Sequence, residues 1–119
     1  MMKMYMPEKS NFYGYCNNFN YVPKTLVFPH LFQILATRKN PIAELREAIA
    51  TYENLYEMFT DYENFTELVV IVNLLSWDLH KENTEVASFL SDEYYRLRDR
   101  FYELFEDKTA RQYFWEMTD

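Results

Sequence analysis

Apolar residues recur at intervals of three and four positions from about Pro29 to the end of the chain, which is the period of amphipathic helices. A first helix is expected from Pro29 to about Arg38. Asn40 and Pro41 then predict a second helix, with Asn40 as the N-cap and proline in the first turn. The apolar residues of this second helix fall on one face, an arc of about 140°. The residues of that face are Ile42, Leu45, Ile49, Tyr52, Tyr56 and Phe59.

Residues 66–79, TELVVIVNLLSWDL, form the least polar stretch of the chain. Thr60 and Glu63 just before it match the capping-box pattern, which favours a helix over the buried strand that the run alone would also allow. One stripe of this helix is formed by Phe65, Leu68, Val69, Val72, Leu75 and Leu79. A second stripe on the other side is formed by Val70, Leu74 and Trp77. A helix that is apolar on both sides must be covered on both sides, by its own chain or by another molecule.

Two more helices are expected, from Thr84 to about Asp107 and from Thr109 to near the C-terminus. Asp92 and Arg96 are spaced as an i, i+4 ion pair on the longer of the two. Tyr95 and Tyr102, seven residues apart, are expected on its outer side. The sequence therefore predicts an all-α fold, a compact bundle of four to five helices.

The first 24 residues differ in character from the rest. They are rich in Tyr, Phe and Asn and contain the single Gly14. We expect an irregular, aromatic N-terminal arm over residues 1–24 and the helical bundle over residues 25–119. A short hairpin turning at Asn17 and Asn18 is the alternative for the arm.

Composition narrows the class of protein. A chain of 119 residues fits one domain. The single Cys16 excludes an internal disulfide and fits a reducing compartment. The N-terminus lacks the apolar core of a signal peptide, and residues 68–79 are too short and too interrupted to span a bilayer. We expect a cytoplasmic protein that does not bind membranes.

Charge is distributed unevenly along the chain. The net charge is −7, yet the first 40 residues carry five basic residues against one acidic residue, so the remainder carries −11. No Lys or Arg occurs between Arg46 and Lys81. The acidic residues at the start of this interval, which we call the acidic belt, are Glu47, Glu53, Glu57, Asp61, Glu63 and Glu67. Such a surface disfavours direct binding of nucleic acid and attracts basic protein surfaces, although acidity can also serve solubility alone.

Patterns for catalysis, metals and cofactors are weak. No zinc or di-iron spacing occurs, and Asp78, His80 and Glu82 cannot converge from one helix. Cys16 with His30 or His80 does not form a recognisable catalytic pair, and no glycine-rich loop exists to hold phosphate. We expect no enzymatic activity, no metal and no cofactor.

These features indicate a protein-binding module. The acidic belt would steer a basic partner, and the apolar second stripe with Tyr95 and Tyr102 would supply contacts. A concrete version is a small acidic inhibitor that mimics nucleic acid and masks the basic surface of a nucleic-acid-handling enzyme, in the manner of counter-defence proteins of phages and mobile elements. The alternative is a structural or assembly adaptor that forms a homodimer through the second stripe.

Overall fold

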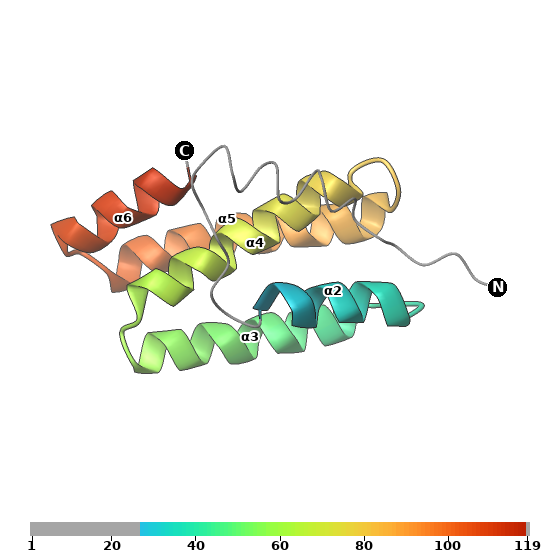
Figure 1. The fold of residues 1–119 in the computed structure, drawn as a ribbon, viewed down its shortest axis with the longest axis horizontal. Helices are drawn as coiled ribbons and strands as arrows, with labels where there is room; N and C mark the ends of the chain where they lie inside the picture. Colours follow the sequence, from blue (N-terminus) through green and yellow to red (C-terminus); the bar gives the residue numbers. More distant parts are fainter. Residues whose placement is uncertain (1–26, 119) are drawn as a thin grey trace.

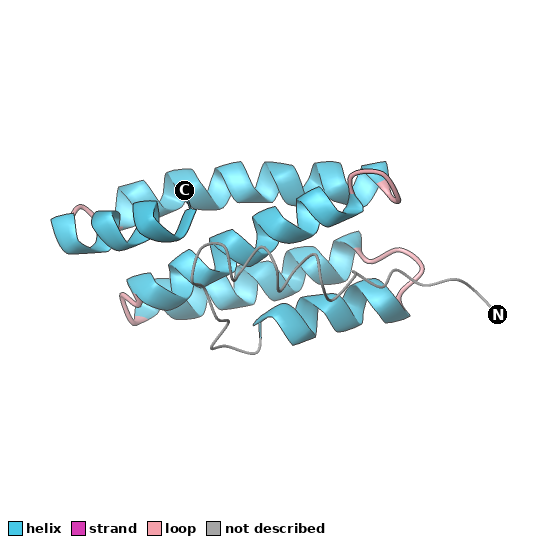
Figure 2. Ribbon diagram, turned by 45° about the horizontal axis from the view of Figure 1, so that its top comes forward, coloured by secondary structure: helices cyan, strands magenta, loops and turns pink. Residues whose placement is uncertain are grey.

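The computed structural model describes residues 27–118, which form five α-helices and no strand (Figures 1 and 2). The helices are α2 (Val27–Thr37), α3 (Ile42–Met58), α4 (Tyr62–Leu79), α5 (Thr84–Leu104) and α6 (Lys108–Thr118). The prediction of an all-α bundle is confirmed. The predicted N-terminal arm and its alternative hairpin lie outside the described residues.

Helix α4 lies at the centre of the bundle, packed against each of the other four described helices. Residues 65–72 of α4 are buried without interruption, followed by Leu74, Leu75 and Leu79. This position explains the apolar stretch that the sequence shows, because a helix surrounded by others needs apolar side chains on several faces. Phe65 adds edge-on ring contacts to Phe101 and Phe105 at centroid distances of 5.9 Å.

The second stripe of α4 does not remain together on the surface. Val70 and Leu74 are buried, with 8% and 6% of their surface exposed, whereas Trp77 is 68% exposed. The surplus apolar surface of α4 is therefore covered largely within the chain, and only Trp77 projects outward.

Helices α3 and α5 run parallel to each other. Short connections join α3 to α4 and α4 to α5, so each consecutive pair is antiparallel. Three contacts between α3 and α5 keep the same offset of 43 residues: Arg46 with Phe89, Glu53 with Arg96, and Glu57 with Arg100. We call this set of contacts the α3–α5 seam.

The helix ends correct several sequence predictions. The α4 cap is Asp61, whose carboxylate accepts the Asn64 N–H at 3.1 Å, and not Thr60. Thr60 has a positive φ of 47° and donates its hydroxyl to the Phe59 carbonyl, so its side chain is turned away from the helix end. An acidic cap fits the positive end of the helix dipole.

Side chains cap two more of the described helices. Asn83 caps α5 by accepting the Val86 N–H, directly before the expected helix start at Thr84. Asp107 accepts the Ala110 N–H at the start of α6, which begins at Lys108, one residue before the expected Thr109. At α3, Pro41 and not Asn40 occupies the cap position, because the Pro41 carbonyl accepts the Leu45 N–H at 2.8 Å; no side chain of the described residues caps this helix.

Candidate protein-interaction surface

Glu53 of the acidic belt is used inside the fold. It is only 8% exposed, and Arg96 of α5 approaches it with 2.9 Å between Nη1 and Oε1. The Arg96 Nε also lies 2.9 Å from Glu93 Oε2. Hydrogen bonding to Glu93, followed by the contribution of Glu53, raises the pKa of Arg96 above its ordinary value. The predicted pair of Arg96 with Asp92 is wrong, because Arg96 is held by these two glutamates.

Glu57 repeats this arrangement one turn later. Arg100 forms a charge-assisted pair with Glu57, and its Nη1 lies 3.3 Å from Glu103 Oε2. The hydrogen bond with Glu57 raises the pKa of Arg100. Further along the same two helices, the Arg46 guanidinium forms a cation–π contact with Phe89, at 5.2 Å from the ring centre. The α3–α5 seam thus uses two carboxylates of the acidic belt to join helices that lie far apart in the sequence.

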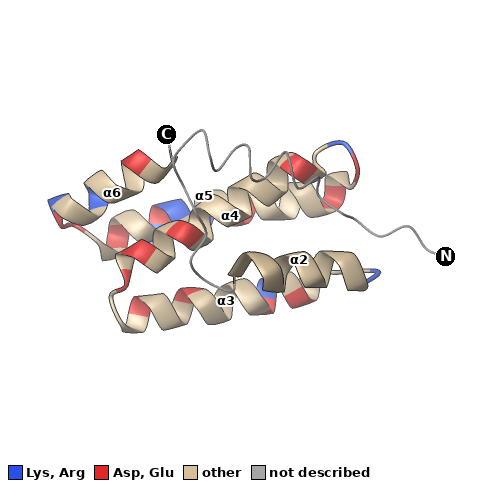
Figure 3. Ribbon diagram, viewed as in Figure 1, with Lys and Arg blue, Asp and Glu red and all other residues tan. Residues whose placement is uncertain are grey.

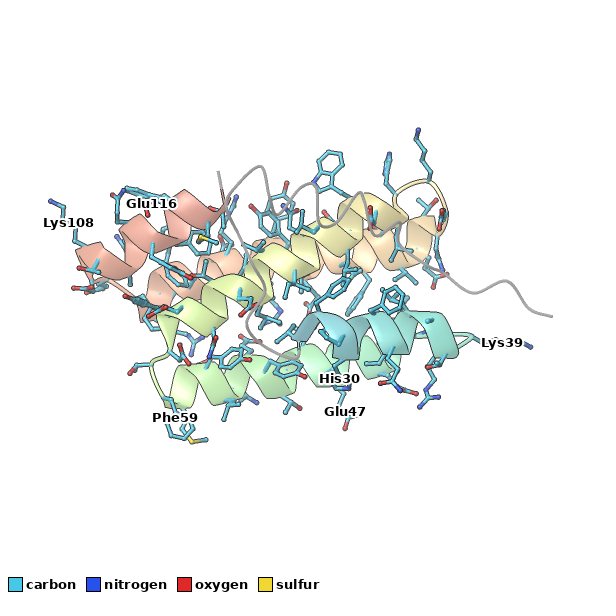
Figure 4. All side chains as sticks on the ribbon, viewed as in Figure 1. His30, Lys39, Glu47, Phe59, Lys108 and Glu116 are labelled. Carbon is cyan, nitrogen blue, oxygen red and sulfur yellow. The ribbon has the colours of Figure 1, made fainter. Side chains whose placement is uncertain are left out.

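The end of α3 presents exposed apolar side chains. Met58 is 73% exposed, Phe59 67% and Leu55 43%. Phe59 was predicted to face the core, and this is wrong. Because α3 ends at Met58 and the chain turns at Thr60, Phe59 projects away from the bundle, as Figure 4 shows. Extrapolating the helical period one residue past the helix end produced the error.

Two acidic residues follow these apolar residues in the chain. Asp61 caps α4 directly after the turn, and Glu63 is exposed in the first turn of α4. Neither forms an ion pair with a Lys or Arg within residues 27–118, in contrast to Glu53 and Glu57. We call the set Leu55, Met58, Phe59, Asp61 and Glu63 the α3–α4 corner.

The negative charge at this corner extends to α6. The pKa of Tyr113 is raised, first by burial and then by Glu63, Glu67, Tyr62 and Asp61. Glu67 itself is 4% exposed, so it does not contribute to the outer surface. Glu63 and Asp61 of the corner therefore lie close enough to α6 to contribute to the raised pKa of Tyr113.

Glu47 lies apart, in a groove between α2 and α3. The groove has a volume of about 560 Å³, and its lining includes His30, Glu44, Glu47 and Tyr52. The His30 ring nitrogen Nδ1 is 2.8 Å from the Tyr52 hydroxyl. Figure 4 shows His30 and Glu47 close together in projection.

Figure 3 shows how the charged residues are distributed over the helices. Helix α2 contains no charged residue, and Asp and Glu are spread over the other helices. The acidic belt is thus divided among four environments: the α3–α5 seam, the α3–α4 corner, the groove lined by Glu47, and the buried position of Glu67.

Trp77 and Tyr95 lie together, but Tyr102 does not join them. Both line a groove between α4 and α5 of about 380 Å³. Tyr102 instead is half-buried against α6, where its hydroxyl accepts the Trp115 Nε1–H at 2.7 Å. The sequence analysis grouped Tyr95 with Tyr102 from their spacing alone. In the structure, Tyr95 lines the α4–α5 groove, whereas Tyr102 packs against α6.

The described residues include no group of three or more His, Cys, Asp or Glu side chains placed to hold a metal ion. His30 contacts Tyr52 on α3, whereas the His80 ring packs by Trp77 at 6.4 Å between centroids. Cys16 lies outside the described residues.

Over residues 27–118, no helix has the length and hydropathy needed to cross a membrane. Comparison of the chain with protein-family models, curated proteins and solved structures gave no match.

Proposed function

We propose that this protein is a non-enzymatic protein-binding module whose α3–α4 corner binds a basic surface of another protein. The observation that supports this most is the exposure of Met58 and Phe59 just before Asp61 and Glu63 in the chain. Large apolar side chains are the usual energetic centre of an interface, and unpaired charges around them steer a partner of opposite charge.

The electrostatics of the corner favour a basic protein over other occupants. Phosphate groups of nucleic acid would be repelled by Asp61 and Glu63. A second copy of the chain docked corner to corner would bring the same carboxylates together, which disfavours such a dimer. A Lys- or Arg-rich surface with an apolar pocket would bind both the apolar side chains and the carboxylates of the corner.

The finer version of the proposal concerns the partner. Protein surfaces rich in Lys and Arg commonly serve to bind DNA or RNA. We therefore propose that the chain acts as a small acidic inhibitor that masks the nucleic-acid-binding surface of an enzyme, in the manner of phage or mobile-element counter-defence proteins. Charge and size support this version.

The alternative function is a structural or assembly adaptor that dimerises through an apolar helix face. Exposure of Trp77 favours it, because a surface tryptophan is a common interface anchor. Burial of Val70 and Leu74 reduces the apolar area that the second stripe could offer. A dimer of this kind would persist at moderate ionic strength, whereas capture through the corner would weaken.

The test is quantitative capture from a cell lysate by the full chain and three variants. Phe59→Ser removes the aromatic anchor and Glu63→Lys reverses an unpaired charge. Glu47→Lys is the matched control, because Glu47 is an exposed glutamate outside the corner. We expect a specific partner to lose on the order of tenfold affinity with Phe59→Ser and with Glu63→Lys, and to be retained by Glu47→Lys.

A second arm tests the masking of a nucleic-acid-binding surface. Excess duplex oligonucleotide should displace the captured partner if the corner occupies its basic surface. Equal capture by all four chains would refute the role of the corner. Capture that depends on the corner but resists oligonucleotide would refute the inhibitor version alone.

A further inference from the structure

The groove between α4 and α5 is formed by small side chains where the two helices face each other. Its lining includes Ser76, Ala87, Ser88 and Ser91. The Ser76 hydroxyl donates to the Ala87 carbonyl at 3.0 Å, which fixes the two helices at this level. Because these side chains are short, the space between the helices remains open over about 380 Å³.

Aromatic rings form the rim of this groove. Trp77 on α4 is 68% exposed and Tyr95 on α5 is 51% exposed. Tyr94 also lines the groove and packs against Tyr95 at 5.1 Å between ring centroids. Tyr and Trp on a rim with Ser and Asn beneath them match the composition of protein surfaces that bind peptides, since rigid rings supply area and short polar groups supply hydrogen bonds.

The charge of the groove selects its ligand. Among the described residues that line it, Asp92 is the carboxylate and His80 the histidine, and no Lys or Arg is present. Asp92 is exposed, and its side chain forms no hydrogen bond or ion pair with another residue of the range 27–118. Arg98 does not line the groove, but it lies 5.0 Å from the centre of the Tyr95 ring, so Trp77 is the ring left to receive a cation of the ligand. An anionic ligand is therefore disfavoured and a cationic side chain is favoured.

The shape of the groove indicates a linear ligand. Its lining on α5 extends from Thr84 to Tyr95, which corresponds to about 16 Å at the α-helical rise. That length accommodates about five residues of an extended peptide. A second copy of the chain is a poorer occupant, because the net charge of −7 opposes self-association at an acidic groove.

We propose that the α4–α5 groove is a peptide-binding site for a short linear segment of another protein, with a Lys or Arg opposite Asp92 and an apolar side chain against Trp77. This site is separate from the α3–α4 corner and does not depend on the function proposed there. The chain would then present two binding sites, one for a basic folded surface and one for a basic linear segment.

The probe for this proposal is a library of random 12-residue peptides selected on the immobilised full-length chain. Enriched peptides are then synthesised and titrated against the Trp115→Phe variant, in which Trp77 is the remaining tryptophan. We expect enriched sequences to share a Lys or Arg beside an apolar residue, and binding to shift the fluorescence of Trp77.

Groove variants make the test specific. Asp92→Asn and Trp77→Ala should each weaken peptide binding on the order of tenfold, as measured by isothermal titration calorimetry, because Trp77→Ala removes the fluorescent reporter. Glu85→Gln is the matched control, because Glu85 is an exposed carboxylate of α5 that does not line the groove. Phe59→Ser should leave peptide affinity unchanged, which separates this site from the corner.

Three results would overturn the proposal. One is the absence of any enriched peptide, or a shared sequence without a basic residue. Another is binding that Asp92→Asn and Trp77→Ala leave intact. The third is a Trp77 already shielded from an added quencher before peptide is present, which would identify residues 1–26 or a second copy as the occupant.

Discussion

Two groups of carboxylates in the acidic belt lie close in sequence but have opposite roles. Glu53 and Glu57 belong to the α3–α5 seam and are paired with Arg96 and Arg100. Asp61 and Glu63 lie at the α3–α4 corner with no Lys or Arg paired to them among the described residues. The density of acidic residues in a sequence therefore does not measure the charge of a surface, because cations 43 residues away neutralise part of it.

Reversing a charge of the seam should have the largest effect on stability. Glu53→Lys would place an ammonium against Arg96 in a position that is 8% exposed. We expect the free energy of unfolding to fall by about 3 kcal/mol, toward the lower end for a buried pair because Arg96 is partly exposed. Urea unfolding followed by circular dichroism measures this loss.

The control is the same reversal at the corner. Glu63→Lys should change the free energy of unfolding by less than about 0.5 kcal/mol. Combining Glu53→Lys with Arg96→Glu should restore part of the lost stability. Equal losses at Glu53 and Glu63 would contradict the distinction between the two groups.

Removing the cap at the corner should have an intermediate effect. Asp61→Ala deprives the Asn64 N–H of its acceptor, and we expect a loss of about 1 kcal/mol in the free energy of unfolding. Thr60→Ala tests the cap that the capping-box pattern indicated. Thermal unfolding should show a smaller loss for Thr60→Ala than for Asp61→Ala; the reverse order would show that Thr60 is the cap.

The smallest effect concerns alkaline pH. The pKa of Tyr113 lies above its ordinary value of 10.0 in the folded chain, chiefly through burial and then through Glu63. The folded state therefore holds this proton more tightly than the unfolded state. The corresponding stability is complete below pH 10.0 and is lost as pH rises through the folded pKa.

Two variants separate the causes of this shift. Tyr113→Phe should make the decline in stability above pH 10.0 less steep than in the parent chain. Glu63→Gln should lower the pKa of Tyr113 slightly, as read by NMR of the labelled ring, whereas Glu47→Gln should not. A Tyr113 pKa unaffected by Glu63→Gln would show that the corner does not act on α6.

Helical periodicity was sufficient to predict the existence and order of the helices after Pro29. It succeeded because the apolar faces of α3, α4 and α5 match positions buried in one core, such as Leu45, Leu68 and Leu97. Errors occurred where local pattern competes with tertiary structure. Thr60 and Asp61 are both acceptable caps, and only the turn after Phe59 decides between them.

The surfaces were harder to predict than the core. Glu53 appeared exposed because its own helix carries no nearby cation, and Arg96 reaches it from α5. The matched spacing of four in Glu53 and Glu57 and in Arg96 and Arg100 could have suggested the seam. The exposure of Phe59 could not be predicted from the sequence, because its position continues the periodic apolar face of α3 by one residue.

The constant offset along the α3–α5 seam has a consequence for how the chain can tolerate changes in length. Extra residues in the connection 80–83 leave both helices intact, so their mutual register can be preserved. One residue inserted within α5 between Phe89 and Arg96 would rotate all later side chains by about 100°. Both arginines would then turn away from α3, so natural or engineered insertions should be accommodated in the connections and selected against inside the paired helices.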